Sequence, residues 1–120
     1  MSKYFQESEM VCSCCGCLPE QGIDPKLYEL LDQMREAAGV PLNINDAYRC
    51  QEHNDSIPNS VPNSQHVDGT AADVDASNIG VEVLAQIAED CGADGVGRYY
   101  GDEFVHVDVR SGKVGDNYRW

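Results

Sequence analysis

Apolar residues recur at helical spacing in two stretches of the chain. In the first, from Pro25 to about Ala38, the side chains that share one face are Leu27, Leu30, Leu31 and Met34. Asp24 can cap the free N–H groups at the start of this stretch, and Gly39 can end it. The second stretch, from Gly80 to about Asp90, shows the same spacing. Both patterns predict amphipathic helices that pack one apolar face on the core.

Four other stretches alternate apolar and polar residues, as half-buried strands do. They are residues 42–45, 70–75, 95–100 and 104–110. Gly101-Asp102, between the last two, fits a tight hairpin turn. In the last stretch Val105 and Val107 fall on one face and His106 falls on the other. We therefore predict an α+β fold, in which two helices cover one face of a small, mainly antiparallel sheet.

Length and composition fit one folded unit. The chain has 120 residues, of which 42% are apolar, and this is enough for a single modest core. We expect one domain over residues 1–120. Residues 51–65 are rich in Asn, Ser and Pro and predict a long loop, and such a loop in a compact domain is more often functional than a spacer.

The sequence predicts neither a membrane span nor a secretory signal. A span needs about 18 or more consecutive apolar residues, and none occurs. The first seven residues contain one lysine but no apolar stretch and no small-residue cleavage site. We expect the protein to stay in the cytoplasm until lysis releases it, unless an upstream segment has been lost.

The chain is strongly acidic, with a formal net charge of −13. This charge repels nucleic acids and anionic membranes over about 8 to 10 Å, one Debye length. We expect no nucleic-acid partner and no membrane partner, and we expect a monomer.

Six cysteines are present, four of them within residues 12–17 and the others at Cys50 and Cys91. Three interpretations stay open. The four clustered residues can form an all-cysteine zinc site, although such sites normally use two separated pairs. A disulfide can join the cluster to Cys50 or Cys91 if the chain works outside the cell. The third interpretation is reduced, partly buried structural thiols.

Three histidines occur, at positions 53, 66 and 106, and two of them lie near carboxylates in predicted strands or strand edges. A catalytic zinc site keeps three protein ligands and leaves a fourth position for water. His66, Asp73 and His106 can supply this set, because a glycine bend after His66 lets it and the aspartate reach one point. His53 is interpreted as a hydrogen-bonding residue of the loop.

Three motifs surround these residues. They are Tyr48-Arg49-Cys50-x-x-His53-Asn54, Ser64-x-His66-x-x-Gly69-x-Ala71-x-Asp73 and Phe104-Val105-His106-Val107-Asp108. In this order they resemble the zinc D-Ala-D-Ala carboxypeptidases and L,D-endopeptidases that cut peptidoglycan, which are grouped structurally with lysostaphin-type peptidases and the hedgehog domain. The resemblance covers about residues 27–110 and leaves the clustered cysteines unmatched.

The resemblance implies zinc (Zn²⁺) bound by His66, Asp73 and His106. Because His106 lies opposite the valine face of its strand, we expect this zinc on the sheet face opposite the helices. Zinc in such a site polarises the scissile carbonyl and acidifies a water, whose proton a nearby carboxylate takes and passes to the leaving amine. The family has an acidic residue three positions before the last histidine, which is Glu103 here. Asp108 is the alternative base, because a regular strand would turn Glu103 away from His106. Asp108 has a further interpretation as the residue that orients a ligand imidazole.

Two more residues are candidates for substrate contact, and the resemblance supplies the role of the first. Arg49 matches an arginine that binds a carboxylate or steadies the developing oxyanion, and a structural ion pair is the alternative. Ser64 either donates a hydrogen bond to substrate or caps the loop.

The leading hypothesis is a zinc metallopeptidase that hydrolyses a peptide bond in the stem or cross-link of bacterial peptidoglycan. A phage lysis enzyme that acts on the cell wall fits this description. The alternative is a zinc-containing binding module of the same fold without turnover. A cysteine-rich metal-storage or redox protein would leave both histidine motifs unexplained.

Overall fold

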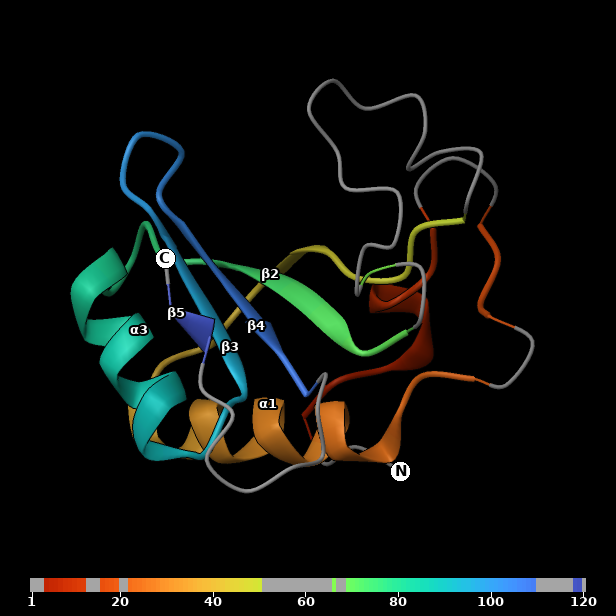
Figure 1. Ribbon diagram of the computed structural model, residues 1–120, viewed down its shortest axis with the longest axis horizontal. Coiled ribbons are helices and arrows are strands. Elements are labelled where there is room, and N and C mark those ends of the chain that lie inside the picture. The colour runs from red at the N-terminus through yellow and green to blue at the C-terminus, as the bar shows by residue number, and fades with distance from the viewer. Residues whose placement is uncertain are drawn as a thin grey trace.

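The computed structural model describes residues 4–12, 16–19, 22–50, 66, 69–109 and 118–119. Its elements are η1 (Glu7–Glu9), α1 (Pro25–Ala38), β1 (Ile44–Asp46), β2 (Ala71–Asp75), α3 (Val81–Asp90), β3 (Gly95–Tyr99), β4 (Phe104–Asp108) and β5 (Tyr118–Arg119) (Figure 1). The predicted α+β class is confirmed, and both predicted helices and all four predicted strands are present. The predicted loop over residues 51–65, with His53 and Ser64, lies outside the described residues.

Capping residues define both ends of helix α1. The carboxylate of Asp24 accepts a hydrogen bond from the N–H of Lys26 at 2.9 Å, and Pro25 takes the first helical position. Gly39 ends the helix with a left-handed φ of 70°. The buried face consists of the predicted Leu27, Leu30, Leu31 and Met34. Neither α1 nor any other helix in the described parts of the chain is long and apolar enough to cross a membrane.

The five strands of the described chain form one sheet in the order β1-β2-β4-β3-β5. Neighbouring strands are antiparallel, except that β5 pairs with β3 in parallel. The register of β2 against β4 sets Asp73 opposite His106 and Val74 opposite Val105. Because opposite residues share a sheet face, this register gives the sheet one polar and one apolar face.

Two features of the sheet differ from the prediction. The tight turn expected at Gly101-Asp102 is wrong, because Tyr99 pairs with Phe104 and the connection runs from Tyr100 to Glu103. Glu103 supplies the left-handed conformation of this connection, with a φ of 54°. Strand β5 has no counterpart in the prediction, because two residues are too few to show a strand period.

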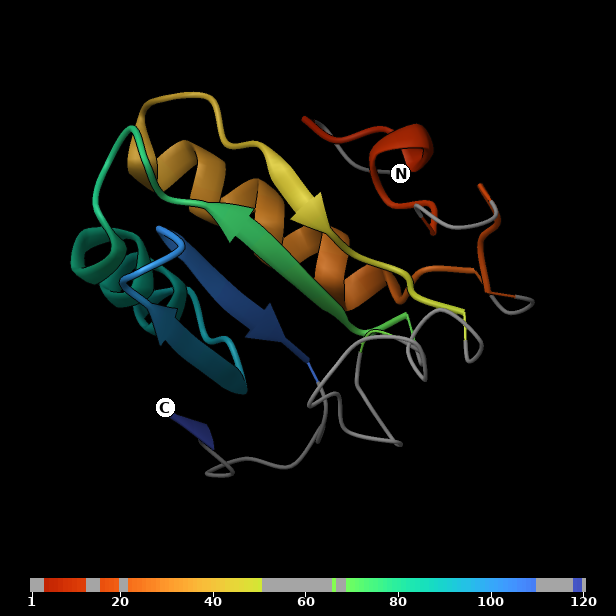
Figure 2. The same ribbon diagram turned by 90° about the horizontal axis from the view of Figure 1, so that it is seen from above.

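The apolar face of the sheet packs on the helices. Helix α1 contacts α3, and α3 contacts β3 and β4; Figure 2 shows α1 running behind β1 and β2. The strand residues that are fully buried in this core are Ala72, Val74, Val96, Val105 and Val107. The core therefore leaves the opposite face of β2 and β4 for polar side chains.

Candidate metal centre

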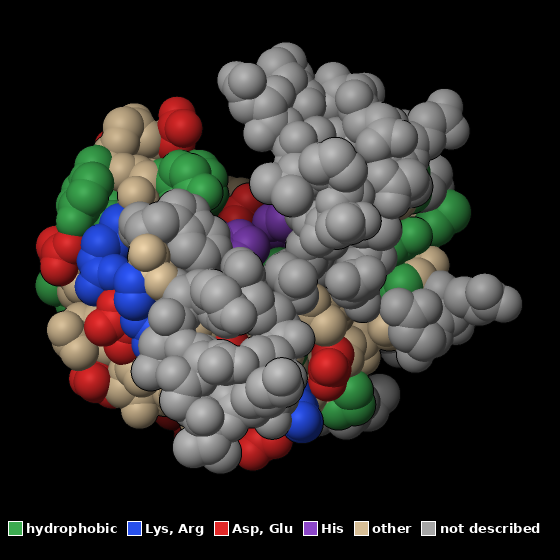
Figure 3. Space-filling view, in the orientation of Figure 1, with side chains coloured by type: hydrophobic (Ala, Val, Ile, Leu, Met, Phe, Trp, Pro, Cys, Tyr) green, Lys and Arg blue, Asp and Glu red, His purple; other side chains and the backbone are tan. Residues whose placement is uncertain are grey.

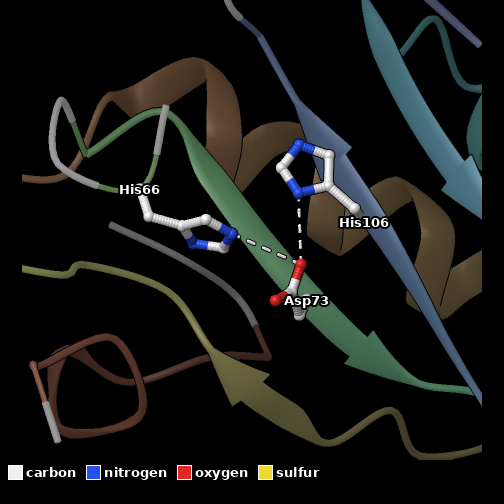
Figure 4. Close-up of side chains that lie close together, drawn as sticks. All are labelled: His66, Asp73 and His106. Carbon is white, nitrogen blue, oxygen red and sulfur yellow. Dashed lines mark hydrogen bonds and ion pairs between the residues drawn. The ribbon is translucent and has the colours of Figure 1, made fainter. Parts of the chain in front are cut away.

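Three side chains from separate parts of the chain meet on the polar face of the sheet. Asp73 in β2 and His106 in β4 are cross-strand partners, and His66 comes from the turn before β2. Figure 4 shows the two rings and the carboxylate turned toward one another in front of the strands, with a helix behind. The structure thus brings together the three residues to which the resemblance assigns zinc.

The carboxylate of Asp73 lies between the two imidazoles. Its Oδ1 atom is 3.1 Å from Nδ1 of His106 and 3.4 Å from Nε2 of His66. One possible ligand atom from each of the three residues lies within 4.8 Å of the others. Ligand atoms about 2.0 Å from a tetrahedral zinc stand roughly 3.3 Å apart. The three residues therefore fit a zinc ion with small side-chain adjustments.

In each imidazole, the nitrogen that points away from Asp73 is engaged by another oxygen of the protein. Nδ1 of His66 lies 2.7 Å from the carbonyl oxygen of Ala47, and since a carbonyl only accepts, Nδ1 carries the proton. Nε2 of His106 lies 2.8 Å from Oδ2 of Asp108 and donates to that carboxylate. This leaves Nε2 of His66 and Nδ1 of His106 as the nitrogens that face Asp73, which is the arrangement that metal-binding histidines use.

Without a bound metal ion, burial and hydrogen bonds between its side chains set the ionisation of this cluster. Burial raises the pKa of Asp73, but hydrogen bonds from His106 and His66 and the positive charge of the rings outweigh it, so the pKa lies well below its ordinary value. Burial lowers the pKa of His106, but its hydrogen bonds with Asp108 and Asp73 outweigh this and raise the pKa above its ordinary value. A metal that binds His106 must therefore compete with a proton.

A tight turn positions His66 beside the start of β2. The N–H of Gly69 donates to the carbonyl oxygen of His66 at 3.3 Å, and Gly69 has a φ of 74°. A Cβ at this position would lie 3.0 Å from Cγ of Pro19 and 3.2 Å from the carbonyl oxygen of Gly22. The predicted glycine bend is confirmed, and both the backbone conformation and the available space require glycine.

Arg49 forms an ion pair next to the cluster. Its Nη2 and Nε atoms lie 2.8 and 3.1 Å from Oδ2 of Asp46, and Asp46 is the cross-strand partner of Asp73. The N–H of Arg49 also donates to the carbonyl oxygen of His66 at 3.1 Å. The ion pair that stood as the alternative to substrate binding is present, and it holds the guanidinium beside the strand that carries Asp73.

The two candidate bases lie in contrasting surroundings. Asp108 is fully buried against His106, in space that Gly95 of β3 leaves open, because a Cβ at Gly95 would collide with the Asp108 carboxylate. Glu103 is exposed in the turn before β4 and is not part of the three-residue cluster. Its positive φ takes Glu103 out of the regular strand alternation that would turn it away from His106. The position of Ser64 lies outside the described residues.

The histidines reach the molecular surface only slightly. His66 is 4% exposed and His106 is 7% exposed. Figure 3 shows the histidine side chains in a hollow, with acidic side chains beside them. The cluster is thus largely shielded from water, and this strengthens its interactions with a bound charge.

Three residues that support the cluster were not predicted from the sequence. The carbonyl of Ala47 acts through the backbone, and Gly95 acts by having no side chain, so neither residue type indicates a role. Asp46 could have been noticed from its position three residues before Arg49. Strand pairing, which the sequence does not give, decides that this pair lies beside the cluster.

Comparison with protein-family models identifies the family to which the chain is similar. The family model described as Peptidase M15 matches residues 3–108, a range that contains the whole cluster together with Arg49, Glu103 and Asp108. No match was found among the curated proteins.

Proposed function

Because this chain belongs to the peptidase M15 family, the zinc D-Ala-D-Ala carboxypeptidase-like peptidoglycan metallopeptidases, we propose that it hydrolyses a peptide bond in the stem or cross-link peptides of peptidoglycan. His66, Asp73 and His106 are the proposed zinc ligands. The bacterial cell wall is the proposed place of action.

The observation that carries this proposal is the orientation of the two imidazoles. The carbonyl of Ala47 and the carboxylate of Asp108 each engage the nitrogen that points away from Asp73. A histidine pair that served only to stabilise the fold would not need both remaining nitrogens to converge on one carboxylate oxygen. M15 peptidases are zinc-dependent, and this donor set suits zinc.

The roles of the remaining groups follow from their surroundings. A bound zinc supplies Lewis-acid chemistry, which polarises a carbonyl and acidifies a water. Asp108 and the Ala47 carbonyl hold the ligand rings in place. Glu103, exposed and outside the cluster, is the proposed carrier of the water's proton to the leaving amine.

Among the peptidoglycan bonds, we favour an internal stem or cross-link bond over the terminal D-Ala. A carboxypeptidase must bind the free carboxylate at the end of the stem. Arg49 is the residue assigned to such a contact, but Asp46 already balances its charge, in a chain of net charge −13. A terminal carboxylate would therefore gain little from Arg49, whereas binding around an internal bond does not require a cation at this position.

The test combines metal content with product analysis. The full chain is loaded with zinc, its metal is measured by mass spectrometry, and purified peptidoglycan is digested. We expect one zinc per chain and muropeptides cut within the stem or cross-link; loss of a terminal D-Ala alone would make the protein a carboxypeptidase. Zinc-loaded protein that releases no product would support the non-catalytic binding module instead.

Two ligand variants and a matched histidine control complete this test. His66→Ala and His106→Ala should lose zinc and hydrolysis together, because three protein ligands leave no substitute. His53→Ala should keep both, since the sequence assigns His53 to the loop. Stoichiometric zinc in the His66→Ala protein would remove His66 from the ligand set.

A further inference from the structure

The segment from Ala47 to Cys50 connects the N-terminal part of the chain to the metal centre. On one side, the N–H of Tyr48 donates to the carbonyl oxygen of Met10 at 3.0 Å. On the other side, the Ala47 carbonyl engages the His66 ring at 2.7 Å, and the N–H of Arg49 donates to the His66 carbonyl at 3.1 Å. A change in the N-terminal part that fixes this segment therefore also fixes the backbone that orients His66.

Two cysteine side chains meet at the end of this segment. The Sγ atoms of Cys12 and Cys50 are 3.7 Å apart, and the N–H of Cys50 points to Sγ of Cys12 at 3.5 Å. Both residues carry thiols rather than a disulfide. A disulfide needs a sulfur separation of about 2.05 Å, so the side chains must close the gap by less than roughly 2 Å. Rotation about the Cα–Cβ bonds moves sulfur atoms over such distances.

We propose that Cys12 and Cys50 form a redox pair, a dithiol under reducing conditions and a disulfide under oxidising conditions. The oxidant is a low-molecular-weight disulfide. Cys50 is half-buried and Cys12 is fully buried, so the Cys50 thiolate attacks the oxidant first and releases one thiolate. The Cys12 thiolate then attacks the Cys50 sulfur of the mixed disulfide and releases the second. One oxidant disulfide is reduced to two thiols, which take up the two protons lost by the cysteines.

The proposed bond has two physical consequences. It closes a chain segment of 38 residue steps that contains α1 and β1, and a cross-link of this span stabilises the fold by restricting the unfolded chain. It also fixes both Ala47 and Arg49, which contact His66, without involving a proposed metal ligand. The oxidised protein should therefore be the more rigid form around the metal centre.

The experiment compares the full chain after treatment with oxidised glutathione and after treatment with a phosphine reductant. Remaining thiols are alkylated and the peptides are mapped by mass spectrometry. We expect a linked Cys12–Cys50 peptide only in the oxidised sample, and a thermal midpoint higher by roughly 5 to 15 °C that reverts on reduction. Both samples are first treated with chelator, so neither readout depends on hydrolysis or on bound zinc.

Variants then assign the effect to this pair. Cys50→Ser and Cys12→Ala should each abolish the redox shift in midpoint, whereas Cys91→Ser, at the end of α3, should keep it. Oxidised protein in which Cys50 links to a different cysteine, or to none, would overturn the proposal. So would a reduced chain that binds a second zinc equivalent and loses it in Cys50→Ser, because the sulfurs would then be metal ligands. The peptide map uses the unaltered chain, so a variant that misfolds does not decide the outcome.

Discussion

Asp108 and Glu103 are both close in sequence to His106, but their surroundings suit different tasks. Asp108 is fully buried and its Oδ2 atom is 2.8 Å from Nε2 of the His106 ring. A carboxylate in this position fixes the ring and the tautomer rather than exchanging protons with substrate. Glu103 is exposed and is the one non-glycine residue with a positive φ in the described parts of the chain. A residue held in this uncommon conformation is a reasonable place to look for function.

Substitution of the two carboxylates should therefore separate chemistry from metal binding. Glu103→Gln should keep full zinc occupancy and lose about 2 to 4 orders of magnitude in kcat, the usual size of a general acid–base contribution. Asp108→Asn should weaken zinc binding by about 10 to 100-fold, with activity restored by added metal. Kinetics and zinc titration of both variants measure this difference. An active Glu103→Gln together with a zinc-loaded, inactive Asp108→Asn would transfer the role of base to Asp108.

A substitution at Gly95 offers a second way to displace the Asp108 carboxylate, without substituting Asp108 itself. A Cβ at Gly95 would collide with the Asp108 carboxylate, so Gly95→Ala should push that carboxylate off the His106 ring. We expect zinc affinity to fall by about 10 to 100-fold, as when a residue that orients a ligand is lost. Gly101→Ala, in the same hairpin but with open space around its Cβ position, is the control. Unchanged zinc affinity in Gly95→Ala would show that Asp108 does not position His106.

At the scale of elements, the metal centre depends on a turn and on a strand register. Strands β2 and β4 set Asp73 opposite His106, and the turn that ends at Gly69 brings His66 to them. The turn is itself tied to the start of α1, because the N–H of Asp24 donates to the Gly69 carbonyl at 3.0 Å. His66, the candidate ligand from outside the sheet, is thus held by the segment that leads into a helix.

Gly69→Ala should damage both the fold and the metal centre. The positive φ of 74° costs an alanine about 1 to 2 kcal/mol, and contact with Pro19 and Gly22 adds to this. We expect unfolding free energy to fall by about 2 to 4 kcal/mol, with weaker zinc binding, in denaturant titrations and zinc titrations. Gly39→Ala is the matched control, because its φ is 70° but its Cβ position is open. It should lose only the backbone contribution and keep its zinc affinity.

At the scale of the whole molecule, a metal bound at the candidate ligand His106 would compete with a proton for this histidine. The pKa of His106 is raised above 6.5 in the folded chain. A raised pKa stabilises the folded chain at pH values below the unfolded value, and this contribution is lost as the pH rises through the folded value. Zinc binding has the opposite pH dependence, because the metal must displace the proton.

The stabilisation by zinc should therefore grow with pH. From about pH 6 to pH 8, the thermal midpoint of chelator-treated protein should fall, and the increase on adding zinc should become larger. Calorimetry with and without zinc over this range measures both trends. His106→Gln should lose both the zinc-dependent increase and this part of the pH dependence. A zinc increment that shrinks as the pH rises would contradict the assignment of His106 as a ligand.

The sequence by itself determined the local features of this protein. Helix α1 and its caps were predictable because Asp24, Pro25 and Gly39 act on their immediate neighbours. The faces of β4 followed from strand alternation, and the candidate metal ligands were proposed from motifs of fixed spacing. The hairpin turn was predicted wrongly, because a glycine-first pair is only one of several sequences that close a hairpin, and here Glu103 takes the left-handed position.

Only the tertiary structure decided how the candidate ligands are held. The engagement of His66 by Ala47, of His106 by Asp108 and of Arg49 by Asp46 all depend on which segments lie side by side. The approach of Cys12 to Cys50 likewise joins residues 38 positions apart. Residue type and local spacing predict what a side chain can do. Strand register and the packing of distant segments determine which atom the side chain faces. The free energy of these contacts comes from neighbours in space, and the local sequence does not specify these neighbours.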